Sequence, residues 1–213
     1  MRWPSLLGVL TLAPVVAAAS LDVDIVAYRR AAAGALGAVT GRAYETGAKS
    51  DAADRPLAGT AVTVLPRSET FLGTLEAIKH GARDSIAAYR DGAAAVRRAR
   101  EAYERALWAE DALDLVRSTD IAADGTFAVR DLPPGRWVLV GVRSVFVDRV
   151  SRRPHPRETR TYATPPRVVS HATVHVWVME IQIASGRVEA VELTDRNVWL
   201  TGVVEEREPD ARR

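Results

Sequence analysis

The chain has no cysteine, which excludes disulfide bonds, a lipid-modified cysteine and a cysteine nucleophile. Lysine is scarce as well, because only Lys49 and Lys79 are lysines among 29 basic residues. The 27 acidic residues reduce the formal net charge to +2, and no basic stripe or nucleic-acid-binding motif is visible. We therefore expect no nucleic-acid partner.

An apolar run long enough to span a bilayer is also missing. Arg2 gives a short positive region, and the apolar stretch from Leu6 to Val16 is too short to span a bilayer comfortably. The small residues Ala17 to Ala19 then form a cleavage site of the signal-peptidase type. The sequence predicts a signal peptide over residues 1–19, a mature protein without a transmembrane span, and a periplasmic or secreted location. An uncleaved anchor is the alternative.

The remaining chain is organised around the stretch from Asp124 to Arg143, which reads as turn, strand, tight turn and strand. Asp124-Gly125 is a turn dipeptide, and Pro133-Pro134-Gly135 turns the chain again. Alternation and unbroken apolar runs predict further strands on both sides. The strands are expected at 21–27, 39–45, 60–65, 126–130, 137–142 (with an extension through 144–150), 172–183, 187–193 and 198–204.

Residues 69–117 differ, because β-branched residues almost vanish and apolar residues recur at helical spacing. A single helix of this length would run roughly 70 Å and carry the chain away from the strand it must rejoin. Two antiparallel helices, 69–90 and 93–117 with a break at Asp91-Gly92, are favoured over one long helix. If the hairpin is a graft on the sheets, a short linker can replace it. If its apolar stripe packs on a sheet, its removal exposes that sheet.

The predicted fold class is mainly β: a prealbumin-like β-sandwich with an inserted α-helical hairpin. The sandwich domain is expected over residues 20–68 and 118–205, and the hairpin insertion over 69–117. Residues 206–213 form a charged tail. Residues 151–169 contain four prolines and a cluster of arginines, which predicts a long loop.

Five short motifs occur in the order found in the carboxypeptidase regulatory-like domains, which have a transthyretin-like β-sandwich. The motifs are Val39-Thr40-Gly41-Arg42, Pro56 to Val64, Ser118-Thr119-Asp120, Asp124-Gly125-Thr126-Phe127 and Leu132 to Trp137. The chain resembles this family over about residues 38–66 and 118–143, and departs from it at the helical segment. The resemblance implies a non-catalytic module that binds a protein partner or carbohydrate, or supports a neighbouring domain.

Enzymatic chemistry has weaker support. His171 and His175 share a strand face but lie roughly 13 Å apart, too far to hold one metal ion. His155 and Tyr162 could approach from the loop, a set similar to that of the intradiol dioxygenases without their close histidine pair. The chain also lacks the terminal signature of the hydroxyisourate hydrolases, and its lysines are badly placed for an isopeptide crosslink. No catalytic residue, cofactor or metal ligand is assigned, and a metal-dependent enzyme stays as the alternative to a binding module.

The aromatic residues supply the candidate contact surface. Trp137 and Trp177 are expected in the core, whereas Tyr103 and Trp108 on the helical segment and Trp199 on the last strand are candidate partner-binding residues. Helix packing on the sandwich is the alternative role for Trp108. The sequence thus favours a binding or structural module of the bacterial cell envelope, with a protein or carbohydrate partner.

Overall fold

The computed structural model describes residues 21–47, 53–147 and 168–207. The predicted signal peptide, His155, Tyr162 and most of the predicted loop 151–169 lie outside the described residues.

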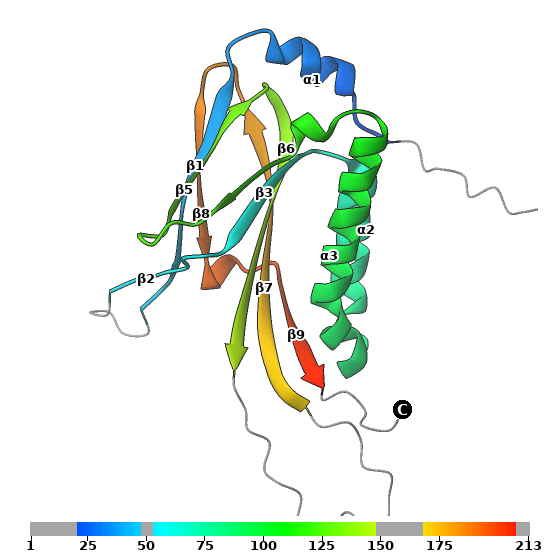
Figure 1. Ribbon diagram of the computed structural model, residues 1–213, viewed down its shortest axis with the longest axis vertical. Helices are drawn as coiled ribbons and strands as arrows, with labels where there is room; N and C mark the ends of the chain where they lie inside the picture. The colour runs from blue at the N-terminus through cyan, green and yellow to red at the C-terminus, as the bar shows by residue number, and fades with distance from the viewer. Residues whose placement is uncertain (1–20, 48–52, 148–167, 208–213) are drawn as a thin grey trace, which may run out of the picture.

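Two sheets form the body of the molecule (Figure 1). In the first, β1 (Gly37–Glu45) pairs antiparallel with β5 (Thr126–Leu132) and with the short β2 (Arg55–Pro56), and parallel with β8 (Val188–Thr194). The second has the order β4–β3–β6–β7–β9 and is antiparallel throughout. Its strands are β4 (Arg117–Asp120), β3 (Ala61–Pro66), β6 (Gly135–Val147), β7 (Val168–Ile183) and β9 (Leu200–Arg207).

The core between the sheets is closed by the two tryptophans that the sequence placed there. Both Trp137 and Trp177 are fully buried. The Trp137 indole N–H donates to the carbonyl of Pro133 over 3.0 Å, and that of Trp177 donates to the carbonyl of Thr194 over 2.8 Å. Each buried indole therefore has its polar atom satisfied. The predicted class, a mainly β sandwich that carries a helical hairpin, is confirmed.

The first predicted strand is wrong, because residues 25–32 form helix α1 (Ile25–Ala32). Asp24 caps this helix, and its Oδ1 accepts a hydrogen bond from the N–H of Ala27 over 2.9 Å. Tyr28 then packs edge-on against Trp137, with the ring centroids 5.0 Å apart. The Asp24 cap and the contact between Tyr28 and Trp137 stabilise a helix, although the short alternating pattern of apolar residues had predicted a strand.

The helical segment forms a hairpin of α2 (Glu69–Gly81) and α3 (Ile86–Ala109), followed by a 3₁₀ turn, η1 (Leu113–Leu115). The predicted break at Asp91-Gly92 is wrong, since the chain turns at 82–85 and Ser85 caps α3. Gly92 lies inside α3 and is buried. A Cβ at this position would lie only 3.3 Å from the Cβ of Ala82, so glycine allows the two helices to pack closely here. The role of this glycine is therefore close packing and not the end of a helix.

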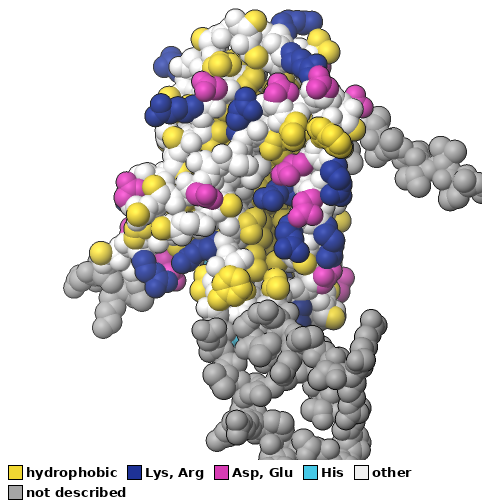
Figure 2. All heavy atoms as spheres, viewed as in Figure 1, with side chains coloured by type: hydrophobic (Ala, Val, Ile, Leu, Met, Phe, Trp, Pro, Cys, Tyr) yellow, Lys and Arg dark blue, Asp and Glu magenta, His cyan; other side chains and the backbone are white. Residues whose placement is uncertain are grey.

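The hairpin lies along the face of the five-stranded sheet opposite the four-stranded sheet (Figure 1). Its contact is close at β9, where a Cβ on Gly202 would lie 2.7 Å from the Cβ of Ala93. Val96 and Leu107 of α3 belong to the same buried cluster as the sheet residues. Figure 2 shows apolar side chains along the junction of sheet and hairpin and charged ones on the outer surface of the hairpin. The hairpin is therefore not a graft that stands apart from the sheets, because its apolar stripe packs on the five-stranded sheet.

The ends of two strands also differ slightly from the predicted positions. Strand β9 continues to Arg207, two residues into the predicted tail, and β7 begins at Val168, inside the predicted loop. Within residues 21–47, 53–147 and 168–207, no helix is both long and apolar enough to cross a membrane.

Candidate functional site

Tyr103, one of the three predicted contact residues, lies in the core. Its ring stacks on Phe71 with centroids 4.6 Å apart, and its hydroxyl donates to the carbonyl of Pro66 over 2.8 Å. Burial raises the pKa of this phenol above its ordinary value. The side chain is only 7% exposed, and both its ring and its hydroxyl make contacts inside the protein, so Tyr103 has a structural role.

The two tryptophans do not form one surface. Trp108 is 68% exposed in the last turn of α3. Trp199 is half-buried against α2, where its indole N–H donates to Glu76 over 3.2 Å and Lys79 lies 4.8 Å from the ring centroid. The next residue, Leu200, contacts the region of Gly92, sixteen residues before Trp108 and so about 24 Å along α3. Of the three predicted contact residues, Trp108 alone has an exposed aromatic side chain.

His171 and His175 lie on β7, as expected. His175 packs edge-on against Trp177 with centroids 6.1 Å apart. Burial lowers its pKa, the positive charge of Arg143 lowers it further, and Glu45 opposes both effects. Among the described residues, no group of three or more His, Cys, Asp or Glu side chains is placed to hold a metal ion.

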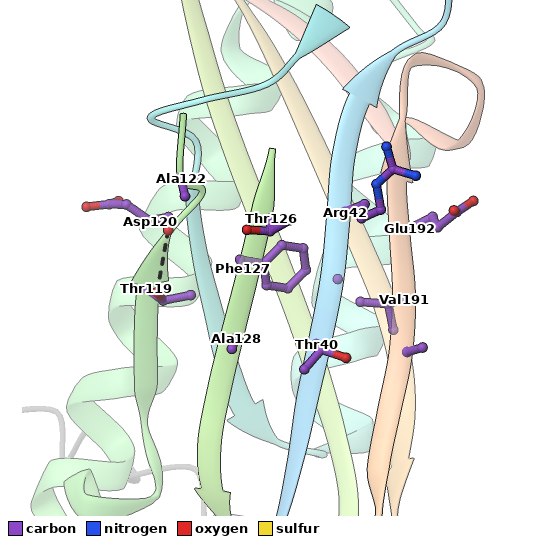
Figure 3. A pocket seen from close by; sticks show the side chains of 12 residues that line it. Thr40, Arg42, Thr119, Asp120, Ala122, Thr126, Phe127, Ala128, Val191 and Glu192 are labelled. Atoms are coloured by element: carbon purple, nitrogen blue, oxygen red, sulfur yellow. Dashed lines mark hydrogen bonds between the residues drawn. The ribbon is translucent and has the colours of Figure 1, made fainter. Parts of the chain in front are cut away.

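The feature that sequence reasoning missed is an open hollow of about 860 Å³ over the four-stranded sheet (Figure 3). Three aligned segments line it, 40–42 of β1, 126–128 of β5 and 190–192 of β8. Thr119, Asp120 and Ala122, from the end of β4 and the turn after it, line it on the far side of β5. The hollow thus joins residues from four separate parts of the chain.

Small side chains make the floor of the hollow. Thr40 pairs with Ala128 on one side and with Ala190 on the other, so these three exposed residues form a row across three strands. An exposed sheet face normally carries longer polar side chains, and their absence here leaves the depression.

Gly41, next to this row on β1, lies against the buried ring of Phe127. A Cβ on Gly41 would lie 2.3 Å from the Phe127 ring, so no larger residue fits without displacing that buried ring. The close contact between Phe127 and the β1 backbone therefore requires glycine.

Polar groups surround the floor. The next row of the sheet is Thr126, Arg42 and Glu192, in register across β5, β1 and β8. Tyr44 donates its hydroxyl to Glu192 over 3.2 Å, and the Arg42 guanidinium lies 5.5 Å from the Tyr44 ring centroid. Desolvation and the hydrogen bond to Glu192 both raise the pKa of Tyr44.

A turn fixes the orientation of one hydroxyl. Thr126 donates its hydroxyl and its N–H to Asp124 over 2.7 and 2.9 Å, and these bonds lower the pKa of Asp124. The Thr126 oxygen keeps its acceptor capacity toward the hollow. Together with Arg42, Glu192 and Asp120, it gives the hollow donors and acceptors on a rigid scaffold, an arrangement suited to binding a polar ligand.

Comparisons with known proteins give fold likenesses alone. No family model matches the chain, and no curated protein does, so the resemblance to the carboxypeptidase regulatory-like domains remains a prediction.

Three solved structures are similar in fold at low identity. The first, a candidate carbohydrate-binding protein from Pseudomonas aeruginosa, is 11% identical with a TM-score of 0.39, and the match covers 76% of this chain and 89% of that one. A minor pilin from Streptococcus agalactiae is 10% identical, with a TM-score of 0.30 and coverage of 84% and 48%. The pilus backbone of Streptococcus pneumoniae is 14% identical, with a TM-score of 0.25 and coverage of 74% and 41%. The hollow is therefore interpreted from its own residues.

Proposed function

We propose that the chain is a non-catalytic binding module of the bacterial cell envelope, and that its ligand occupies the hollow over the four-stranded sheet. The observation that carries this proposal is the floor of Ala128, Thr40 and Ala190, bordered by Arg42 and Glu192. Ligand sites are mostly apolar concavities with a few fixed polar groups, and the hollow combines small side chains on its floor with the charged pair Arg42 and Glu192 beside it.

The sequence predictions fit this role. The predicted signal peptide over residues 1–19 would deliver the chain to the periplasm or the exterior. The resemblance to carboxypeptidase regulatory-like domains also implies a module that binds a protein partner or a carbohydrate. Trp108 remains a second candidate contact, at a distance from the hollow.

The proposal is tested by co-sedimentation of the purified protein with an isolated bacterial envelope fraction. Ala128→Trp fills the floor of the hollow with an indole. Arg130→Trp places the same group on the same exposed face of β5, outside the hollow. Both positions are exposed, so both variants should fold, which circular dichroism will check.

We expect wild type and Arg130→Trp to co-sediment with the envelope, and Ala128→Trp to bind at least about tenfold more weakly, a loss of about 1.4 kcal/mol. Equal binding by the two tryptophan variants, or no binding by wild type, would refute the proposed function.

A further inference from the structure

We infer that the ligand of the hollow is a neutral or amino-sugar glycan; this inference rests on the proposed function and specifies its ligand. Three features of the hollow favour such a ligand: the protein groups that remain available for binding, the shape of the floor and the charge of the lining residues.

The backbone of β1, the central strand of the floor, is already used. Along residues 40–42, β1 pairs with β5 on one side and with β8 on the other. A peptide lying on this face could not add to the sheet as a strand, and its own N–H and C=O groups would lack the regular partners that a sheet edge provides. On the face over β1, recognition must therefore come from side chains.

The side chains match a ligand with hydroxyl groups at its edges and C–H groups on its faces. The Ala128 and Ala190 methyl groups lie on strands separated by β1, about 10 Å apart, and offer a flat apolar contact. Arg42 provides several N–H donors, and the carboxylate of Glu192, which already accepts from Tyr44, has further lone pairs for a ligand hydroxyl. A pyranose ring has both kinds of surface, so a chain of such rings satisfies the floor and the rim together.

Charge narrows the class of glycan. Arg42 is the one cationic residue among those that line the hollow, against the two carboxylates of Asp120 and Glu192, so the lining has a net charge of −1. Uronic acids and phosphorylated sugars would meet like charge, whereas neutral sugars would not and a protonated amino sugar would be attracted.

The test uses the envelope fraction after two separate treatments. The glycan treatment combines periodate, which cleaves vicinal diols and free 1,2-amino alcohols of sugars, with lysozyme, which cleaves the N-acetylated strands that periodate leaves intact. The protein treatment is proteinase K. We expect the binding that Ala128→Trp removes to be lost after the glycan treatment and kept after proteinase K. Binding that survives the glycan treatment, or that protease alone removes, overturns the glycan assignment while leaving the binding module intact. An untreated envelope that fails to bind wild type refutes the proposed function itself.

Soluble competitors test the charge argument. Dextran and glycol chitosan represent neutral and amino-sugar chains, and alginate represents an anionic chain. Dextran or glycol chitosan should displace the protein from the envelope, with alginate at least about tenfold weaker. Glu192→Gln should reduce this discrimination against alginate, and Arg130→Trp should leave it unchanged. Alginate competing best against wild type would overturn the charge assignment.

Discussion

Gly202→Ala tests how closely the hairpin packs on the sheet. The new Cβ would lie 2.7 Å from the Cβ and 3.1 Å from the backbone nitrogen of Ala93. Carbon atoms in contact prefer about 3.5–4.0 Å, so α3 and β9 must separate by about 1 Å. Neither atom belongs to a flexible side chain that could rotate away. We therefore expect the cost typical of overpacking, about 1–3 kcal/mol, from a total stability of about 5–15 kcal/mol.

Gly73→Ala is the matched control. Gly73 lies inside α2, and a Cβ there would meet no atom within 4 Å. The same substitution should stabilise the protein by up to about 1 kcal/mol, because alanine favours the helix. Urea unfolding monitored by circular dichroism measures both changes. A loss below about 0.5 kcal/mol for Gly202→Ala would show that α3 does not approach β9 as described.

Three further changes test other parts of the fold. Trp137→Ala should cost about 3–5 kcal/mol in denaturant melts, because it leaves a cavity beneath Tyr28; a loss below about 1 kcal/mol would contradict the burial of Trp137. Asp22 accepts hydrogen bonds from Ser68 and from the N–H of Thr70 at the start of α2. Asp22→Ala should therefore cost about 1 kcal/mol of stability and lower Tm by about 2–4 °C. An unchanged Tm would refute this capping role of Asp22. His175 has a folded pKa below its ordinary 6.5, so the unfolded chain binds the proton more tightly and stability should fall as pH drops through that region. His175→Gln should flatten this slope in urea melts from about pH 7.5 to about pH 5, and an identical slope would contradict the assigned shift.

Asp22, like His175, makes the protein less stable as the pH falls, but it acts over a lower range of pH. Burial raises its pKa, but the hydrogen bonds from Ser68 and Thr70 outweigh that effect and the net pKa is lowered. Its contribution is therefore present at neutral pH and disappears as pH falls through the carboxylate range, below that of histidine.

Most strands were predictable because one face of each is buried and the other is exposed. In β5, Phe127 and Val129 are buried while Thr126 and Ala128 are exposed, which is the alternation read from the sequence. The turn at 82–85 was not predictable from local preference, since Asp91-Gly92 has the local pattern of a helix end, whereas the packing of Gly92 against Ala82 and Leu200 lies inside the fold. Ser85 offered a cap signal that the Asp91-Gly92 turn signal obscured.

The hollow could not be derived from the sequence, because it depends on strand pairing between distant segments. The parallel pairing of β1 with β8 places Ala190 beside Thr40, 150 positions earlier in the chain. No local pattern marks Ala128, Thr40 and Ala190 as neighbours. By contrast, Trp108 and Trp199 were predicted as contact residues because they are aromatic, although the structure separates them and packs Trp199 against α2.

The central claim, that ligand binds over the four-stranded sheet, is tested most directly by site-specific photo-crosslinking. Because the chain has no cysteine, a single introduced cysteine carries the label alone. Ala122→Cys places a benzophenone at the rim of the hollow, and Ala109→Cys places it beside Trp108 on the exposed end of α3. With the envelope fraction added, the claim predicts a crosslinked product from position 122 and little from position 109. Crosslinking from position 109 with none from position 122 would contradict the claim and assign binding to the hairpin.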